Sequence, residues 1–179
     1  RLTLGQFYAA MEKYEMAIEQ YEIWAEAAFV VGAQERLTMA QLYYQLERKD
    51  DSLRSVKLGI SEAEAKGILP KESFWDLGTA LYNEKNQMDK VIDYLEKLVT
   101  HYPKWKYWKQ LGGMFGAQER MTDQLVAYEV IYLNGELTKE SDVLAMAYMY
   151  LGAEVPYRAA KIIEKGIKDE IVEKNFKHY

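Results

Sequence analysis

The stretch WKQLGGMF, residues 108–115, contains the pattern that decides the fold: Leu111, then the small residue Gly112, then the aromatic residue Phe115 three positions later. The same pattern recurs along the chain. Its copies are Leu4-Gly5-x-x-Tyr8, Met39-Ala40-x-x-Tyr43, Gly78-Thr79-x-x-Tyr82, Leu111-Gly112-x-x-Phe115 and Met146-Ala147-x-x-Tyr150. Successive small residues are 35, 39, 33 and 35 positions apart. A period of this length is typical of stacked helical repeats.

A second series begins twelve residues after each small position, with members four and then three residues apart. Its members are Ala17, Tyr21 and Trp24; Ser52, Val56 and Gly59; Val91, Leu95 and Leu98; Gln124, Tyr128 and Ile131; and Ala159, Ile163 and Gly166. This spacing marks one stripe of a helix. Each unit is therefore predicted to be two antiparallel helices that approach closely at the small residue. We expect an all-α protein, a right-handed solenoid of about five helix-turn-helix repeats.

The spacing places the repeats at about 1–33, 34–68, 71–103, 104–137 and 138–171 of one domain that spans 1–179, with 172–179 starting a further or capping helix. The one long step is assigned to an insertion at Gly67–Pro70, because glycine ends helices and proline precedes them. A lone helix pair cannot bury both of its faces, so a stack that ends abruptly exposes an apolar end. Self-association through the exposed repeat ends is therefore expected.

Composition excludes several classes of function. The chain has 179 residues, of which 49% are hydrophobic, and a net charge of -5. It can bury a core, but it has no basic footprint for nucleic acid. The lysines and aromatic residues of 101–116 are therefore interpreted as helix-face and packing residues rather than a base-stacking surface. No apolar run approaches the roughly 20 residues that a spanning helix needs, so no direct membrane insertion is expected.

Catalytic and metal chemistry have few candidate residues. The chain has no cysteine, and its two histidines, His101 and His178, lie far apart in the sequence. The glycines of LGGMFG lack the spacing and the Lys-Ser/Thr ending of a phosphate loop. Carboxylates alternate with lysines, as they do on solvated helix faces. We expect no enzyme activity, no catalytic residues, no cofactor and no metal.

The residues Trp108-x-x-Leu111-Gly112-x-x-Phe115, with Tyr128 and the preceding Pro103, resemble the tetratricopeptide repeat family, and the resemblance extends over nearly the whole chain. It implies that the first helix of each repeat lines a concave groove that binds a protein or peptide partner. The predicted groove residues are Gln41, Tyr44, Gln45, Asn83, Lys106, Lys109, Gly113 and Tyr148. Gly113 and Gly116 are expected to form a bare groove wall that a ligand backbone approaches.

Two longer segments, LVTHYPKWKYWKQLGGMFG and MAYMYLGAEVPYRAAKIIEKGI, are similar to tetratricopeptide proteins that accompany TonB energy-transducing systems of Gram-negative bacteria. Pro156, Tyr157 and Lys161 contribute to this similarity without being required by the repeat. The resemblance implies a periplasmic scaffold for uptake of iron carriers. Two alternatives stay open: a cytoplasmic or envelope-assembly adaptor that binds peptide segments, and an accessory domain of an enzyme.

Overall fold

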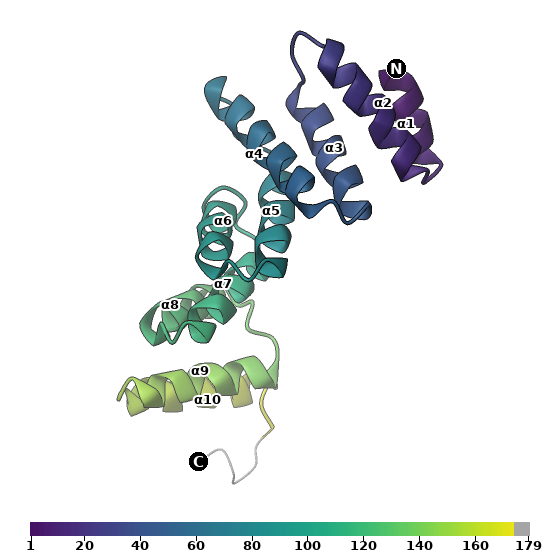
Figure 1. The fold of residues 1–179 in the computed structure, drawn as a ribbon. Helices are drawn as coiled ribbons and strands as arrows, with labels where there is room; N and C mark the ends of the chain where they lie inside the picture. Colours follow the sequence, from purple (N-terminus) through teal and green to yellow (C-terminus); the bar gives the residue numbers. More distant parts are fainter. Residues whose placement is uncertain (174–179) are drawn as a thin grey trace. The chain divides into compact units, whose positions relative to one another are not determined.

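The computed structural model describes residues 1–173, and within that range all regular secondary structure is α-helical (Figure 1). The helices are α1 (Leu2–Ala10), α2 (Tyr14–Ala27), α3 (Ala33–Gln45), α4 (Lys49–Ala65), α5 (Glu72–Glu84), α6 (Met88–His101), α7 (Trp105–Ala117), α8 (Met121–Leu133), α9 (Glu140–Gly152) and α10 (Pro156–Lys168). The prediction of an all-α protein built from helix pairs is confirmed. The predicted helix at 174–179 lies outside the described residues, and 171–173 are not helical.

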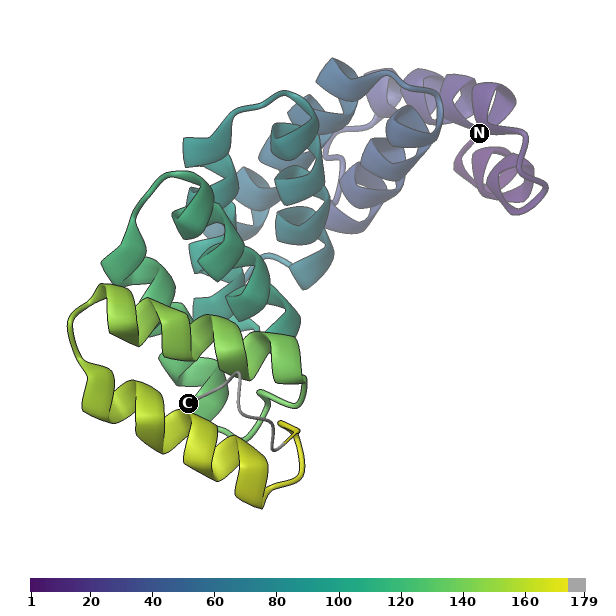
Figure 2. The same cartoon turned by 90° about the horizontal axis from the view of Figure 1, so that it is seen from below.

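The chain divides into two compact units, Arg1–Leu98 and Val99–Tyr179. The first unit contains α1 to α5 and most of α6, and Figure 1 shows α1 beside α2 and α3 beside α4. The second unit contains α7 to α10, and Figure 2 shows α9 and α10 as neighbouring antiparallel helices. Each unit is thus built from consecutive helix pairs joined by short turns.

Paired helices approach closely where the repeat places a residue without a side chain. A Cβ atom added at Gly5 would lie 2.8 Å from Cδ2 of Tyr21, a ring on the partner helix α2. At Gly112 it would lie 3.1 Å from Cε2 of Tyr128 on α8. These glycines therefore leave the space that a tyrosine ring fills, as the repeat pattern predicts.

The third repeat shifts this contact by one position. The sequence pattern predicts Thr79 as the small residue, but the space is at Gly78, where an added Cβ atom would lie 2.2 Å from Cε1 of Tyr94. The Tyr94 ring packs edge-on against Trp75 and Tyr82, with ring centroids 5.1 Å and 5.0 Å away. Thr79 is buried, and its hydroxyl donates to the Trp75 carbonyl at 2.8 Å. The other repeats have a large side chain at the position of Gly78, whereas here the large side chain is Tyr94 on the facing helix α6.

The turn inside each repeat has the same backbone conformation. One residue in each turn has a positive φ angle: Glu12 (57°), Glu47 (57°), Asn86 (55°), Glu119 (58°) and Glu154 (60°). The N–H of the next residue then donates to the carbonyl of the repeat's aromatic residue. These bonds run from Lys13 to Tyr8 (3.0 Å), Arg48 to Tyr43 (2.9 Å), Gln87 to Tyr82 (3.0 Å), Arg120 to Phe115 (2.9 Å) and Val155 to Tyr150 (2.9 Å). This geometry is the Schellman motif that ends helices.

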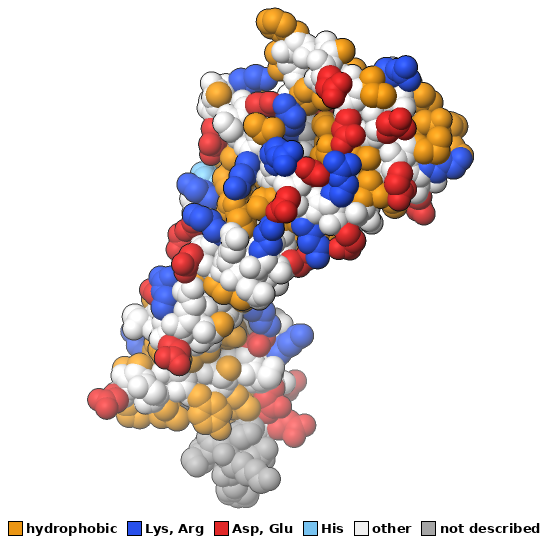
Figure 3. Space-filling model, viewed as in Figure 1, with side chains coloured by type: hydrophobic (Ala, Val, Ile, Leu, Met, Phe, Trp, Pro, Cys, Tyr) orange, Lys and Arg blue, Asp and Glu red, His pale blue; other side chains and the backbone are white. Residues whose placement is uncertain are grey.

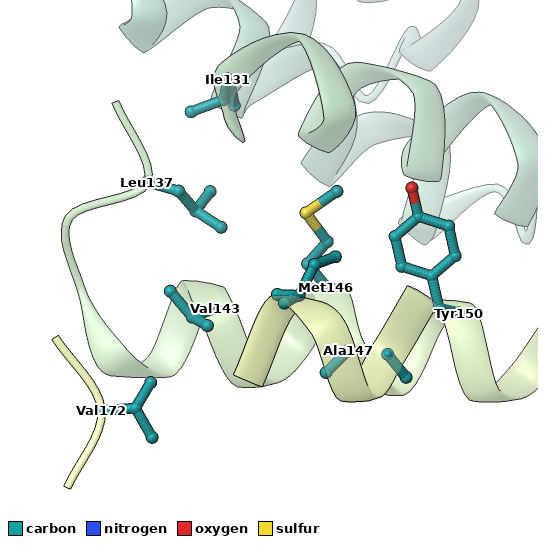
Figure 4. Close-up of a cluster of buried hydrophobic side chains, with 9 residues drawn as sticks. Ile131, Leu137, Val143, Met146, Ala147, Tyr150 and Val172 are labelled. Atoms are coloured by element: carbon teal, nitrogen blue, oxygen red, sulfur yellow. The ribbon is translucent and has the colours of Figure 1, made fainter. Parts of the chain in front are cut away.

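Each unit has its own apolar cluster. In the first unit Ala17, Ile18 and Tyr21 of α2 pack with Met39, Leu42 and Tyr43 of α3. In the second unit the cluster joins α8, α9 and α10, and Figure 4 shows Met146 and Tyr150 rising from the same side of α9. Val172, just beyond α10, closes this cluster beside Val143. The stacking of successive repeats thus buries apolar side chains that a single helix pair would leave exposed.

Replacing Gly78 by alanine tests the close helix contact. We expect Gly78→Ala to lower the free energy of unfolding by about 1–3 kcal/mol, because the new methyl group would force the Tyr94 ring out of its packed position. Gly113→Ala is the matched control, since an added Cβ atom there meets nothing within 4 Å. It should raise stability by about 0.5–1 kcal/mol through helix propensity. Urea denaturation followed by circular dichroism measures both, and equal effects would contradict this packing.

Replacing Glu119 by glycine tests the turn geometry. Side-chain-bearing residues pay about 1–2 kcal/mol for the left-handed conformation, so Glu119→Gly is expected to stabilise the protein by about 0.5–1 kcal/mol. Glu19→Gly, at an exposed site inside α2, should instead destabilise by about 1 kcal/mol, since glycine disfavours helix. Thermal denaturation of the two variants distinguishes the cases. A loss of stability in both would show that the turn does not require a positive φ angle.

Candidate interaction surfaces

The predicted groove residues of the first unit lie on the first helices α3 and α5. Gln41, Gln45 and Asn83 are exposed, as a binding surface requires. Tyr44 instead bridges the two helices, because its hydroxyl donates to Glu84 Oε1 at 2.7 Å. That hydrogen bond raises the pKa of Tyr44, and the hydrogen bond from Lys49 lowers the pKa of Glu84. A ligand at this surface therefore meets exposed amides beside a tyrosine that already has a partner.

The predicted residues of the second unit lie on α7 and α9. Lys109 of α7 forms an ion pair with Asp142 of α9, so this predicted groove cation links the two helices. The Lys106 ammonium lies 4.4 Å from the centroid of the neighbouring Tyr107 ring. Tyr148 has 66% of its surface exposed, and Gly113 is also exposed. The second unit thus presents the exposed Tyr148 side chain on α9 and, at Gly113, a part of α7 without a side chain.

Gly116 does not belong to that bare surface, and this part of the prediction is wrong. A Cβ atom added at Gly116 would lie 2.5 Å from Nε2 of Gln124, a residue of the paired helix α8. The repeat usually has a small residue where Gln124 stands. The glycine therefore compensates for the larger amide on α8 and has a packing role. Gly113, three residues earlier on α7, has no such neighbour.

A cavity that the sequence interpretation did not predict lies in the second unit. Its volume is about 390 Å³. It is lined by Glu129, Tyr132 and Leu133 of α8, Tyr150 of α9, and Tyr157 and Arg158 of α10, among others. The prediction considered only the first helices of the repeats, whereas this cavity is formed mainly by second helices. The available signal was Tyr157 and Lys161, residues that the repeat does not require.

Two polar clusters join second helices to the repeat aromatic of the following pair. In the first unit the Tyr43 hydroxyl donates to Glu22 Oε1 at 2.9 Å, and Arg48 Nη2 lies 3.1 Å from the same oxygen. Burial and the Glu22 hydrogen bond raise the pKa of Tyr43 to about 12. In the second unit the Tyr150 hydroxyl donates to Glu129. Both hydroxyls therefore stay protonated at neutral pH and act as donors.

The first helix carries an exposed apolar stripe. Leu4, Phe7 and Met11 are spaced three and four residues apart on α1 and its end, and they are 39%, 59% and 46% exposed. This stripe belongs to the amino-terminal end of the first unit, where no earlier helix pair is present among the described residues. Self-association through a repeat end stays a prediction, and this stripe is the surface that would mediate it. Elsewhere on the first unit, Figure 3 shows Lys and Arg interspersed with Asp and Glu.

Among residues 1–173, no group of three or more His, Cys, Asp or Glu side chains is arranged to hold a metal ion. Within the same range, no helix combines the length and the apolar character needed to cross a bilayer. The candidate binding features of the described residues are the exposed faces of first helices and the cavity between second helices.

Helix pairs, Schellman turns and a tyrosine packed against a residue without a side chain define a fold of the tetratricopeptide repeat type. Solved structures of MamA share this fold. One from strain AMB-1 is 16% identical, with a TM-score of 0.67 over 96% of this chain and 91% of that chain. Another, MamA 41-end from Desulfovibrio magneticus RS-1, is 14% identical, with a TM-score of 0.61 over 94% and 92% of the two chains.

At this level of identity the similarity shows the fold, and it confirms the predicted helix-pair solenoid class. The sequence matches no protein-family model and shows no significant similarity to curated protein sequences.

Proposed function

We propose that this protein is a non-catalytic scaffold that binds a segment of a partner protein on the exposed face of α7 and α9. The single observation that carries the proposal is the combination of two exposed apolar side chains with two open glycines. Tyr148 and Leu151 of α9 are 66% and 48% exposed. A Cβ atom added at Gly113 or Gly152 would meet nothing within 4 Å.

Gly113 lies inside α7 and Gly152 is the last residue of α9, and neither glycine makes room for a packed side chain. Glycine inside a helix costs about 1 kcal/mol relative to alanine, and Gly78, Gly112 and Gly116 offset that cost by giving space to a neighbouring side chain. At Gly113 and Gly152 the space is open instead. An approaching peptide backbone can use it to reach the helix, while the Tyr148 ring supplies contact area with little loss of conformational entropy.

Site-specific photo-cross-linking tests this function. We expect a photoreactive amino acid at position 148 to form an adduct with one protein partner in intact source cells, because Tyr148 lies on the proposed surface. The same amino acid at position 19, an exposed site on α2, is the control. The Tyr148→Ala and Leu151→Ala double variant should bind the identified partner at least tenfold more weakly by biolayer interferometry. Unchanged affinity, or equal adducts at both positions, would contradict the proposal.

For the cellular setting we propose a periplasmic scaffold that accompanies a TonB-type system for iron-carrier uptake. The support is the resemblance of the segments at 98–116 and 146–167 to tetratricopeptide proteins of such systems, as described under Sequence analysis. The cellular setting does not depend on which surface binds the partner, so the setting and the binding surface are tested by separate experiments.

Fusion reporters test the setting. The full-length protein fused to alkaline phosphatase should be active in intact cells, because that enzyme matures only where disulfides form, and deletion of the gene should slow uptake of an iron carrier. A fusion to a cytoplasm-restricted fluorescent protein is the control. If only that fusion is active, the periplasmic setting is wrong and the cytoplasmic adaptor is favoured.

A further inference from the structure

The cavity of about 390 Å³ in the second unit lies between second helices, whereas the surface proposed above is made by first helices. Its apolar walls are Leu133 of α8 and Tyr157 and Ile162 of α10. Leu133 and Tyr157 are 80% and 72% exposed, so large apolar side chains border the hollow. Its volume falls within the range of about 300–1,000 Å³ that is typical of ligand sites.

The cavity lining includes a polar cluster made by Tyr150, Glu129 and Arg158. Tyr150 is buried, and its hydroxyl donates to Glu129. Arg158 Nη1 lies 3.4 Å from Glu129 Oε1 and 3.5 Å from the Tyr150 oxygen. The charge of Glu129 is therefore compensated from two sides, and it does not repel an incoming anion as an unpaired carboxylate would.

The equivalent cluster of the first unit shows what is different here. Arg48 lies 4.6 Å from the Tyr43 ring centroid and contacts two carboxylates, Glu22 at 3.1 Å and Asp51 at 2.9 Å. Val155 occupies the position in the fifth repeat that corresponds to Arg48, and Arg158 occupies the position that corresponds to Asp51.

The position of the second carboxylate, Asp51 in the first unit, is thus occupied by the cation Arg158 in the second unit. Among residues 1–173, Nη1 of Arg158 makes both of its polar contacts, and Nε and Nη2 make none. The Arg158 guanidinium therefore keeps two donor groups for a further acceptor.

We propose that this cavity binds an acidic peptide segment of a partner protein that inserts one apolar side chain. Arg158 and Lys161 give the lining two cations against the single carboxylate Glu129, on a chain whose net charge is -5. A ligand carboxylate has the geometry to accept hydrogen bonds from the Arg158 fork. The inserted side chain packs on Leu133, Tyr157 and Ile162.

Positive charge continues along α10 beyond the cavity, which favours an extended segment over a small molecule. Arg158, Lys161, Lys165 and Lys168 are spaced three, four and three residues apart, so they share one side of the helix. Lys161 pairs with Glu164 at 2.8 Å, with both side chains more than half exposed. Exposed pairs of this kind are worth little, so a ligand carboxylate can exchange with Glu164.

Panning a random dodecapeptide display library on immobilised protein tests this inference. We expect the enriched peptides to combine Asp or Glu with Phe, Leu or Trp, and representative peptides to bind at least tenfold more weakly to Arg158→Glu with Lys161→Glu. Tyr157→Ala, which leaves the charges unchanged, should also weaken binding at least fivefold, because the inserted side chain loses its wall. Affinity measured by fluorescence polarisation should fall as salt is raised.

The matched control is Arg54→Glu with Lys90→Glu, which makes the same change in net charge at exposed positions on α4 and α6. Circular dichroism confirms that each variant is folded. Peptides without acidic residues, or equal losses in the control variant, would overturn the inference. Loss with the charge variant but not with Tyr157→Ala would overturn the insertion of an apolar side chain. Tyr148→Ala should leave this binding unchanged, which separates the result from the function proposed above.

Discussion

Paired helices pack closely at a small residue in each repeat, and in three of the five repeats this residue is a glycine that faces a tyrosine ring. At Gly5 and Gly112 the ring of the partner helix occupies the volume that a Cβ atom and its substituents would fill. The contact sets the distance between paired helices and so determines which side chains reach the next pair. At Gly78 the same solution appears one position earlier, with Tyr94 enclosed by Trp75 and Tyr82.

The aromatic residue of each repeat connects this packing to the turn and to the neighbouring helix pair. Its carbonyl accepts the hydrogen bond that ends the first helix, in every repeat from Tyr8 to Tyr150. In the second, third and fifth repeats its side chain faces the preceding second helix: Tyr43 donates to Glu22, Tyr82 lies 5.9 Å from the Lys57 ammonium, and Tyr150 donates to Glu129. In the second and fifth repeats one residue thus ends a helix, packs in the core and donates a hydrogen bond at a repeat junction.

Functional variation arises where this shared scheme is altered by single residues. The fifth repeat has Val155 and Arg158 where the second repeat has Arg48 and Asp51, and a hollow with unused donors lies beside Arg158. In the same way, Gly112 and Gly116 make room for side chains of α8, whereas Gly113 makes room for no neighbouring side chain. Both surfaces proposed for binding are such departures, and both lie on an exterior where exposed ion pairs contribute little energy.

The helix pairs, their period and the small residues Gly5, Ala40, Gly112 and Ala147 could be predicted from the sequence, because they follow from local periodicity and from the steric limit at a helix crossing. The exposure of Gln41, Gln45, Asn83, Gly113 and Tyr148 is predicted from the resemblance to the tetratricopeptide family, applied to the repeat register. The partners of the predicted positions are visible only in the folded protein. Gly116 faces Gln124, Lys109 pairs with Asp142, Tyr44 is held by Glu84, and Tyr157 and Arg158 border a cavity with α8. These contacts join residues from different helices, and the side-chain volumes and charges that meet there are not constrained by a pattern within any one of them.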